Sequence, residues 1–168
     1  FASRRPDVLS FTMDIGEDLT LAGPVIANIL TSISTTDADF VVKLIDVFTE
    51  DFSYPSNTLN NGKDYPMGGY QMLVRGEIMR GKYRNSFTLP EAFVPNQPTK
   101  VSFELPDVAH TFKKGHQLMI QIQSSWFPLA DRNPQVFTNI YKADAGDFKK
   151  AVIRILDGTY FDLPVLKN

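Results

Sequence analysis

The chain has 168 residues, enough for one domain with a full hydrophobic core, and its apolar fraction of 43% is ordinary for a globular protein. A net charge of −2 argues against general attraction to nucleic acid or an anionic membrane, and no apolar run is long enough to span a bilayer. The absence of cysteine excludes disulfides, thiol nucleophiles and thiolate metal sites, but leaves the compartment open. The start, Phe-Ala-Ser-Arg-Arg, shows neither Met nor a signal-peptide pattern, so we expect a piece of a longer protein.

The first half of the chain is typical of a series of β-strands. Val8–Met13 is a short candidate strand. Leu19–Ile33 is a long one whose odd positions are nearly all apolar, and Gly23-Pro24 within it predicts a bend or bulge. Asp39–Phe48 is apolar on both faces apart from three charged residues, as expected for a central strand. Residues 50–69 are rich in Pro, Asn, Gly, Asp and Ser, which predicts a long surface loop.

The next segments are also predicted as strands. Tyr70–Tyr83 fits either a strand or a helix, and we favour a strand because Gly76 and Gly81 would each cost an isolated helix about 1 kcal/mol. Lys100–Leu105 alternates polar and apolar residues and is the clearest half-buried strand of the chain. Val108–Lys113 follows it as a separate short segment.

A turn at Lys114–Gly115 leads into the candidate strand Gln117–Phe127, in which Leu118, Ile120 and Ile122 share one side. Counting in steps of two places Trp126 on that same side. The remaining elements are a polar loop over residues 130–148 and two short strands, Ala151–Leu156 and Phe161–Val165. Many short strands, many turn residues and no long amphipathic helix predict an all-β fold, an antiparallel β-sandwich of the jelly-roll kind.

Residues that could perform chemistry are few. No G-x-S-x-G nucleophile motif is present, so Ser125 paired with His110 or His116 is less well supported than serines that simply fill a strand end. The two histidines flank the Lys-Lys-Gly turn without the spacing of a zinc motif, and we expect turn histidines bonded to backbone rather than a metal site. Neither a metal nor a cofactor is predicted.

Charged and aromatic residues allow further interpretations. Arg75, Arg80, Lys82 and Arg84 concentrate positive charge, but the acidic total favours a solvated face or an interdomain ion-pair network over nucleic-acid binding. The aromatic residues permit an alternative function, a carbohydrate-binding jelly-roll module, which would need coplanar exposed rings. A jelly-roll enzyme with its own carboxylate pair has the least support, because no motif places two acids together.

A family resemblance joins these observations. Residues His110–Gln135 match the pattern H-T-F-x-x-G-H-x-L-x-x-Q-I-x-S-S-x-F-P-L-x-D-R-N-P-Q. Further matching segments are Arg5–Phe11, Leu21–Val25, Asp37–Val47, Gly68–Arg75 and Arg80–Phe87. Together they resemble the C-terminal β-domain of X-prolyl dipeptidyl-peptidases and cocaine esterases (the CocE/NonD serine hydrolases), and are most similar to α-amino acid ester hydrolases and glutaryl-7-aminocephalosporanic acid acylases. The resemblance implies a jelly roll of the galactose-binding-domain-like type.

The resemblance also implies a role. It places the Ser-His-Asp triad in an α/β-hydrolase domain that precedes this one in the same polypeptide, so residues 1–168 are expected to be a single non-catalytic C-terminal domain. We expect that domain to dock on the catalytic one and help shape its cleft. Interface candidates are Trp126, Phe127, Asp131, Arg132 and Asn133, although the residues alone equally allow Asp131, Arg132 and Asn133 a purely structural role.

The parent is expected to act on esters or amides, with α-amino acyl esters or β-lactam side chains implied by the resemblance and dipeptides released after proline left open. A homo-oligomer of the parent and a secreted or periplasmic location also stay open. Removal of the partner domain predicts an exposed apolar patch on this chain.

Overall fold

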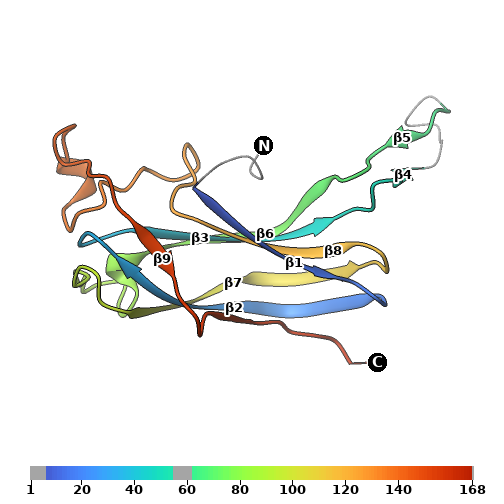
Figure 1. Cartoon of the computed structure of the whole chain (residues 1–168), viewed down its shortest axis with the longest axis horizontal. Helices are drawn as coiled ribbons and strands as arrows, with labels where there is room; N and C mark the ends of the chain where they lie inside the picture. The colour runs from blue at the N-terminus through green and yellow to red at the C-terminus, as the bar shows by residue number, and fades with distance from the viewer. Residues whose placement is uncertain (1–6, 55–61, 168) are drawn as a thin grey trace.

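The computed structural model describes residues 7–54 and 62–167, and a jelly roll of antiparallel strands makes up its regular structure (Figure 1). Arg5 and Pro6 of the first matching segment, and residues 55–61 of the predicted 50–69 loop, lie outside the described residues. The elements are β1 (Val8–Asp14), β2 (Leu19–Ile33), β3 (Asp39–Val47), β4 (Ser53–Tyr54), β5 (Tyr65–Pro66), β6 (Gln71–Arg80), the 3₁₀ helix η3 (Gly81–Tyr83), β7 (Thr99–Phe112), β8 (Gln117–Gln123), the 3₁₀ helix η4 (Ile140–Lys142), β9 (Ile153–Ile155) and β10 (Tyr160–Asp162).

The strand pairing follows a nested pattern. β1 pairs with β8, β2 with β7, β3 with β6 and β4 with β5, and each of these pairings is antiparallel. One sheet has the order β1-β8-β3-β6, while β10-β2-β7, with β9 also on β2, forms the sheet that faces it. Such nesting of outer around inner hairpins is the jelly-roll topology, so the predicted antiparallel β-sandwich is confirmed.

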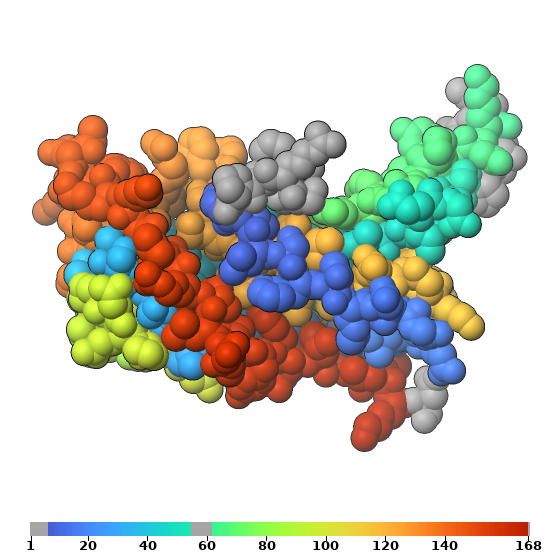
Figure 2. Space-filling view, in the orientation of Figure 1, coloured from blue at the N-terminus to red at the C-terminus, as the bar shows by residue number. Residues whose placement is uncertain are grey.

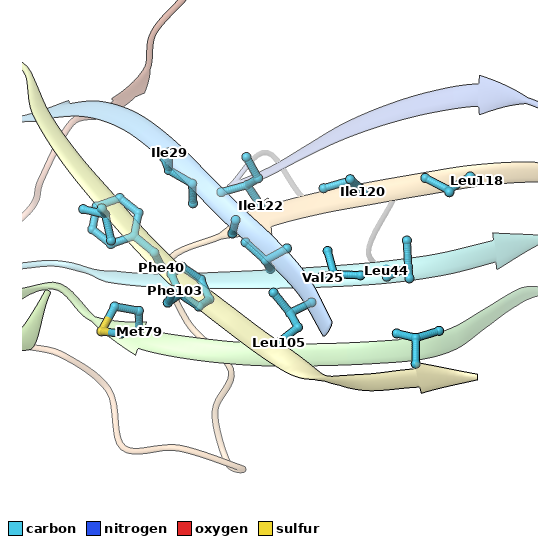
Figure 3. Close-up of a cluster of buried hydrophobic side chains, with 14 of the residues drawn as sticks. Val25, Ile29, Phe40, Leu44, Met79, Phe103, Leu105, Leu118, Ile120 and Ile122 are labelled. Carbon is cyan, nitrogen blue, oxygen red and sulfur yellow. The ribbon is translucent and has the colours of Figure 1, made fainter. Parts of the chain in front are cut away.

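The space between the two sheets is filled by alternating apolar side chains, as Figure 3 shows. The odd positions of β2, the even positions of β3 from Phe40 to Leu44, and Leu118, Ile120 and Ile122 of β8 all point into it. β3 lies between β8 and β6, and Val41 and Ile45 are also buried on its other face. The sequence pattern therefore identified the central strand correctly, because both of its faces are covered.

Several predicted boundaries differ from the structure, three of them for a clear physical reason. β7 is one continuous strand, because a bulge opposite Gly23–Val25 accommodates Pro106 without breaking the pairing with β2. β8 ends at Gln123 rather than Phe127, since the Gln123 amide donates to the Ser125 carbonyl (2.6 Å) and turns the chain out of the sheet. The predicted 50–69 loop contains the short β4–β5 hairpin, which projects from the sandwich in Figure 1.

The other predicted strands are present with shifted ends: β9 covers only Ile153–Ile155 of the predicted Ala151–Leu156, and β10 is Tyr160–Asp162 where Phe161–Val165 was predicted. Tyr70–Tyr83 contains the strand β6 followed by η3, and Gly115, with φ 88°, makes the tight turn between β7 and β8. Within residues 7–54 and 62–167 no helix is long or apolar enough to cross a membrane.

Candidate functional site

The segment after β8, residues 124–149, contains the five interface candidates Trp126, Phe127, Asp131, Arg132 and Asn133, and we name it the 124–149 loop. It rises, in orange, at one end of the β1-β8-β3-β6 sheet (Figure 1). Large apolar side chains of this loop face solvent: Phe127 is 64% exposed, Leu129 72% and Tyr141 86%. Clustered exposure of this kind is typical of an interaction surface.

Asn133 attaches the loop to the body of the domain. Its side chain is buried, and Nδ2 donates to Asp37 Oδ2 (3.1 Å) and to Asp39 Oδ1 (2.7 Å). Its Oδ1 accepts from the backbone N–H of Gln135 (2.8 Å). An asparagine suits this position because one side chain supplies both the donor for two carboxylates and the acceptor for a backbone amide. The amide group of Asn133 thus faces the interior.

The two aspartates bring β3, β6 and the loop together. Asp39 accepts from the guanidinium of Arg80 through both oxygens (3.1 and 3.2 Å), and Arg80 also donates to the Asp131 carbonyl (3.0 Å). Burial alone would lower the pKa of Arg80, but its hydrogen bonds and charge interaction with Asp39 outweigh this and raise it. Arg80 therefore stays charged, and this ion pair fixes the backbone of the loop at Asp131.

Asp37 is the most buried carboxylate of the cluster. It accepts from the backbone N–H groups of Ala38 (2.9 Å) and Lys82 (3.0 Å), in addition to Asn133. Desolvation raises the pKa of Asp37, and the hydrogen bond from Asn133 only partly opposes that rise. Sequence analysis missed both Asp37 and Asp39. The available signal was a pair of carboxylates at the start of a strand buried on both faces, where each needs a partner.

Trp126 lies on the other face of the sheet from the one that the period-two count predicted. Its ring lies against Gly76, whose Cβ position is 2.5 Å from a Trp126 ring atom, and beneath Lys43 (Nζ 4.8 Å from the ring centroid). Lys43 and Gly76 are paired on the outer face, opposite the core side of β3. The prediction was wrong because the count assumed a straight strand, whereas the chain leaves the sheet after Gln123. With its edge against Gly76 and Lys43 over one ring face, Trp126 is a poor platform for a sugar ring.

Arg132 is held between two aromatic rings at the exposed surface of the loop. Its guanidinium carbon is 5.7 Å from the centroid of Phe127 and 5.5 Å from that of Phe148. Within the part of the chain that the structure describes, its guanidinium has no hydrogen bond or ion pair. The stacking limits the side chain's freedom while leaving its N–H donors directed at solvent, where a carboxylate could accept from them.

Comparison with known proteins identifies the family of this sandwich. Residues 2–160 match the family described as the X-Pro dipeptidyl-peptidase C-terminal non-catalytic domain. The chain belongs to this family. The resemblance inferred from the sequence motifs is therefore confirmed, and the chain is a non-catalytic domain of the C-terminal type.

Individual relatives of this C-terminal domain are hydrolases. It is 27% identical to the cocaine esterase of Rhodococcus sp. (strain MB1 Bresler), over 98% of this chain and 26% of that protein. Among solved structures, an α-amino acid ester hydrolase shares 43% identity with a TM-score of 0.86, covering 96% of this chain and 26% of the hydrolase. An aminopeptidase from a marine sediment archaeon, Thaumarchaeota archaeon, shares 37% with a TM-score of 0.87, covering 98% and 27%. The chain thus spans about a quarter of the length of each relative.

The two histidines of the domain, which we expected to bond to backbone, form a cluster with Asp46. Asp46 bridges them: Oδ2 lies 2.8 Å from His110 Nε2, and Oδ1 lies 2.8 Å from His116 Nδ1. The expected backbone bonding of these rings is therefore wrong, because a buried carboxylate at the end of β3 takes both. Among the described residues, no three His, Cys, Asp or Glu side chains group as a metal site.

The geometry also separates Ser125 from both histidines. The histidine cluster lies where β8 begins, since Asp46 is paired with Leu118, whereas Ser125 lies beyond the other end of that strand. A serine–histidine pair for nucleophilic attack is therefore not assembled by these residues. This agrees with the non-catalytic character of the family.

The basic residues of β6 and η3 serve contacts inside the domain. Arg75 donates to the Asp107 carbonyl (2.6 Å), and Lys82 is buried and donates to the Thr138 carbonyl (2.6 Å). Arg84 pairs with Glu91 (3.3 Å). Together with the Arg80–Asp39 pair, these side chains join loops to the sheet, so a solvated face does not describe the buried Lys82, although Arg75 is exposed. The interdomain ion-pair network stays a prediction.

Proposed function

We propose that residues 1–168 form one domain that packs on an α/β-hydrolase catalytic domain of the same polypeptide and helps shape its active-site cleft. The parent is then a serine hydrolase that cleaves or transfers acyl groups at an ester or amide bond through an acyl-enzyme. Similarity to an α-amino acid ester hydrolase supports α-amino acyl esters as its substrates, and the motif resemblance adds β-lactam side chains as a second candidate class.

The observation that supports this proposal best is the contrast within the 124–149 loop between its outer and inner sides. Outward, Phe127 and Leu129 are largely exposed. Inward, Asn133 and the Asp131 carbonyl are bonded to Asp39 and Arg80, so the exposed side chains are presented from a fixed backbone. A preorganised apolar surface binds at a smaller entropic cost than a mobile one, which suits permanent contact with a neighbouring domain.

Arg132 supplies the polar part of the proposed contact. Arginine and aromatic side chains dominate the energetics of protein interfaces, and a guanidinium flanked by Phe127 and Phe148 would be desolvated when a partner covers the loop. In such surroundings it requires a carboxylate or several carbonyl acceptors from the catalytic domain.

The test uses the whole polypeptide that contains this chain and a chromogenic α-amino acid ester as substrate. Replacing Phe127→Ser together with Leu129→Ser is expected to lower kcat/KM at least about tenfold, equivalent to about 1.4 kcal/mol, because the cleft loses its support. Tyr160→Ser is the control, since Tyr160 is 51% exposed but lies on β10, on the outer face of the opposite sheet.

Two results would contradict the proposal. One is an equal, small effect of the loop variants and of Tyr160→Ser. The other is saturable ester hydrolysis by this chain alone that Ser125→Ala abolishes, since that would make the domain itself catalytic.

A further inference from the structure

One side of the sandwich is open along β1. This strand is an edge strand that pairs only with β8 among the described residues. Leu9, Phe11 and Met13 lie opposite Ile122, Ile120 and Leu118, so they share the inward-facing side of the sheet. Nevertheless they are 46%, 52% and 48% exposed. The apolar pattern of β1 is thus directed toward the core side but is not covered by it.

The other wall of this opening comes from the C-terminal part of the chain. Ile155 of β9, Phe161 of β10 and Leu163 face β1 across a cavity of about 490 Å³. A second cavity of about 350 Å³ continues past Ile155 toward Leu9 and Val152. Figure 2 shows the two walls on one face of the molecule, β1 in dark blue and the C-terminal segments in red. We call this continuous hollow the β1 groove.

The β1 edge lacks the features that usually protect an edge strand. Its sequence, V-L-S-F-T-M-D, contains no lysine and no proline, and its seven pairs with β8 run without a bulge. Natural edge strands are normally shielded by charges, prolines, bulges or a covering segment. Since β1 carries a row of exposed apolar side chains beside an apolar hollow, covering by another segment is the remaining device.

The charges around the groove indicate what kind of segment covers it. Among the described residues, the charged side chains lining the two cavities are all aspartates: Asp157 in the first, Asp7 and Asp39 in the second. Asp39 is already paired with Arg80. Asp157 is exposed and has no hydrogen bond or ion pair within the described part of the chain. A complementary partner therefore combines apolar side chains with a Lys or Arg near Asp157.

We infer that the β1 groove receives a segment of the catalytic domain in the same polypeptide, one that carries apolar side chains and a flanking Lys or Arg. This inference rests on the proposed function and adds a second contact surface to it, with the chemistry of the segment that fills it. The relatives, about four times longer than this chain, contain ample sequence for such a segment.

The experiment measures covering in the whole polypeptide by thiol labelling. This chain has no cysteine, so Met13→Cys, Leu129→Cys and Tyr160→Cys each introduce one site into it. Labelling by iodoacetamide is followed at each peptide by mass spectrometry, and each rate is divided by the rate of the same thiol after denaturation. Met13 and Tyr160 are matched, being 48% and 51% exposed, so only a covering segment should separate them.

The expected result is that the thiol at position 13 reacts at least about tenfold more slowly than the thiol at position 160, as for a site reached only by local opening. Equal rates at 13 and 160 with protection at 129 would overturn the groove inference and leave the proposed loop docking intact. Equal rates at all three sites in a folded polypeptide would overturn both.

A charge reversal tests the chemistry of the partner. In the Met13→Cys background, Asp157→Lys should raise the labelling rate several-fold, because it opposes the inferred basic side chain. Glu104→Lys, on the exposed side of β7, is the control and should leave the rate unchanged. If Asp157→Lys has no more effect than Glu104→Lys, the segment is not basic and the inference is wrong in that respect.

Discussion

The 124–149 loop and the β1 groove both expose apolar side chains, but different forces form them. The loop has no strand partner and is fixed by buried polar contacts, above all those of Asn133 with Asp37 and Asp39. The groove is lined mainly by β-strands, whose backbone path is set by strand pairing. Its apolar side chains have no further layer over them in the described part of the chain. Buried polar contacts thus hold the exposed surface of the loop, which has little regular structure. In the groove, the exposed surface results from the apolar pattern of β1 at a place where the two sheets are not closed.

The largest effect is expected from removing the carboxylate that joins the loop to β6. Asp39→Ala removes the carboxylate that pairs with the partly buried Arg80 guanidinium and one of the two carboxylate acceptors of the buried Asn133 amide. We expect a loss of about 3–5 kcal/mol in the free energy of unfolding, measured with urea. Glu91→Ala is the control, because Glu91 is exposed in its pair with Arg84 and should cost about 1 kcal/mol or less. Similar costs would mean that the loop does not depend on buried charge.

Asn133→Ala should weaken the loop but not the groove. It removes the donor to both aspartates and the acceptor for Gln135, for an expected cost of about 2 kcal/mol. Amide hydrogen exchange should accelerate across the 124–149 loop and stay unchanged in β1. Asn139→Ala, which removes an exposed cap of η4, should affect only residues near Tyr141. Faster exchange in β1 would show that the two regions are coupled.

Gly76→Ala tests how closely the base of the loop packs on the sheet. The added Cβ would lie 2.5 Å from a ring atom of Trp126, so the ring must move, at a cost of about 1–3 kcal/mol. Trp126 is the single tryptophan, and its fluorescence should report the movement directly. Gly16→Ala, with nothing within 4 Å of the new Cβ, is the control. Unchanged fluorescence would contradict the contact.

In the groove, Phe11→Ala should have a smaller effect on this chain. Phe11 is half-exposed, so truncation forfeits only part of the burial energy of a phenylalanine, about 1 kcal/mol. The same substitution in the whole polypeptide should cost more, because the inferred segment would bury the ring completely. Urea unfolding of both forms measures the difference, and equal costs would argue against a covered groove.

The smallest effect concerns pH. Burial raises the pKa of Asp37 above that of the unfolded chain, so its ionisation is disfavoured by folding. The contribution of Asp37 is therefore fully present below the unfolded pKa and is lost as pH rises through the folded pKa. The stability of the wild type relative to Asp37→Asn should fall over the interval that starts near the unfolded pKa, about 4, and runs through the raised folded pKa. A relative stability that rises over this interval would reverse the assigned direction.

The sequence predicted well wherever one local pattern controls the outcome. Alternation identified the inward faces of β2, β7 and β8, and apolar residues on both faces identified β3 as central. Gly23-Pro24 marked the bulge correctly. The sequence predicted the ends of strands poorly: Pro106 did not interrupt β7, and Trp126 did not follow the alternation of β8. In both cases a segment distant in sequence, β2 at Gly23–Val25 or the outer face of the sheet at Gly76, decided the backbone path.

The amino-acid sequence alone was enough for the fold class and the family, because strand periodicity and local motifs are properties of neighbouring residues. Only the tertiary structure could show that Asn133 meets carboxylates nearly a hundred positions away, that Asp46 joins His110 to His116, and that Phe11 faces Phe161 across an open groove. These contacts join segments that approach one another only when the nested hairpins close. Their energies depend on burial and distance, which no local pattern of residues encodes.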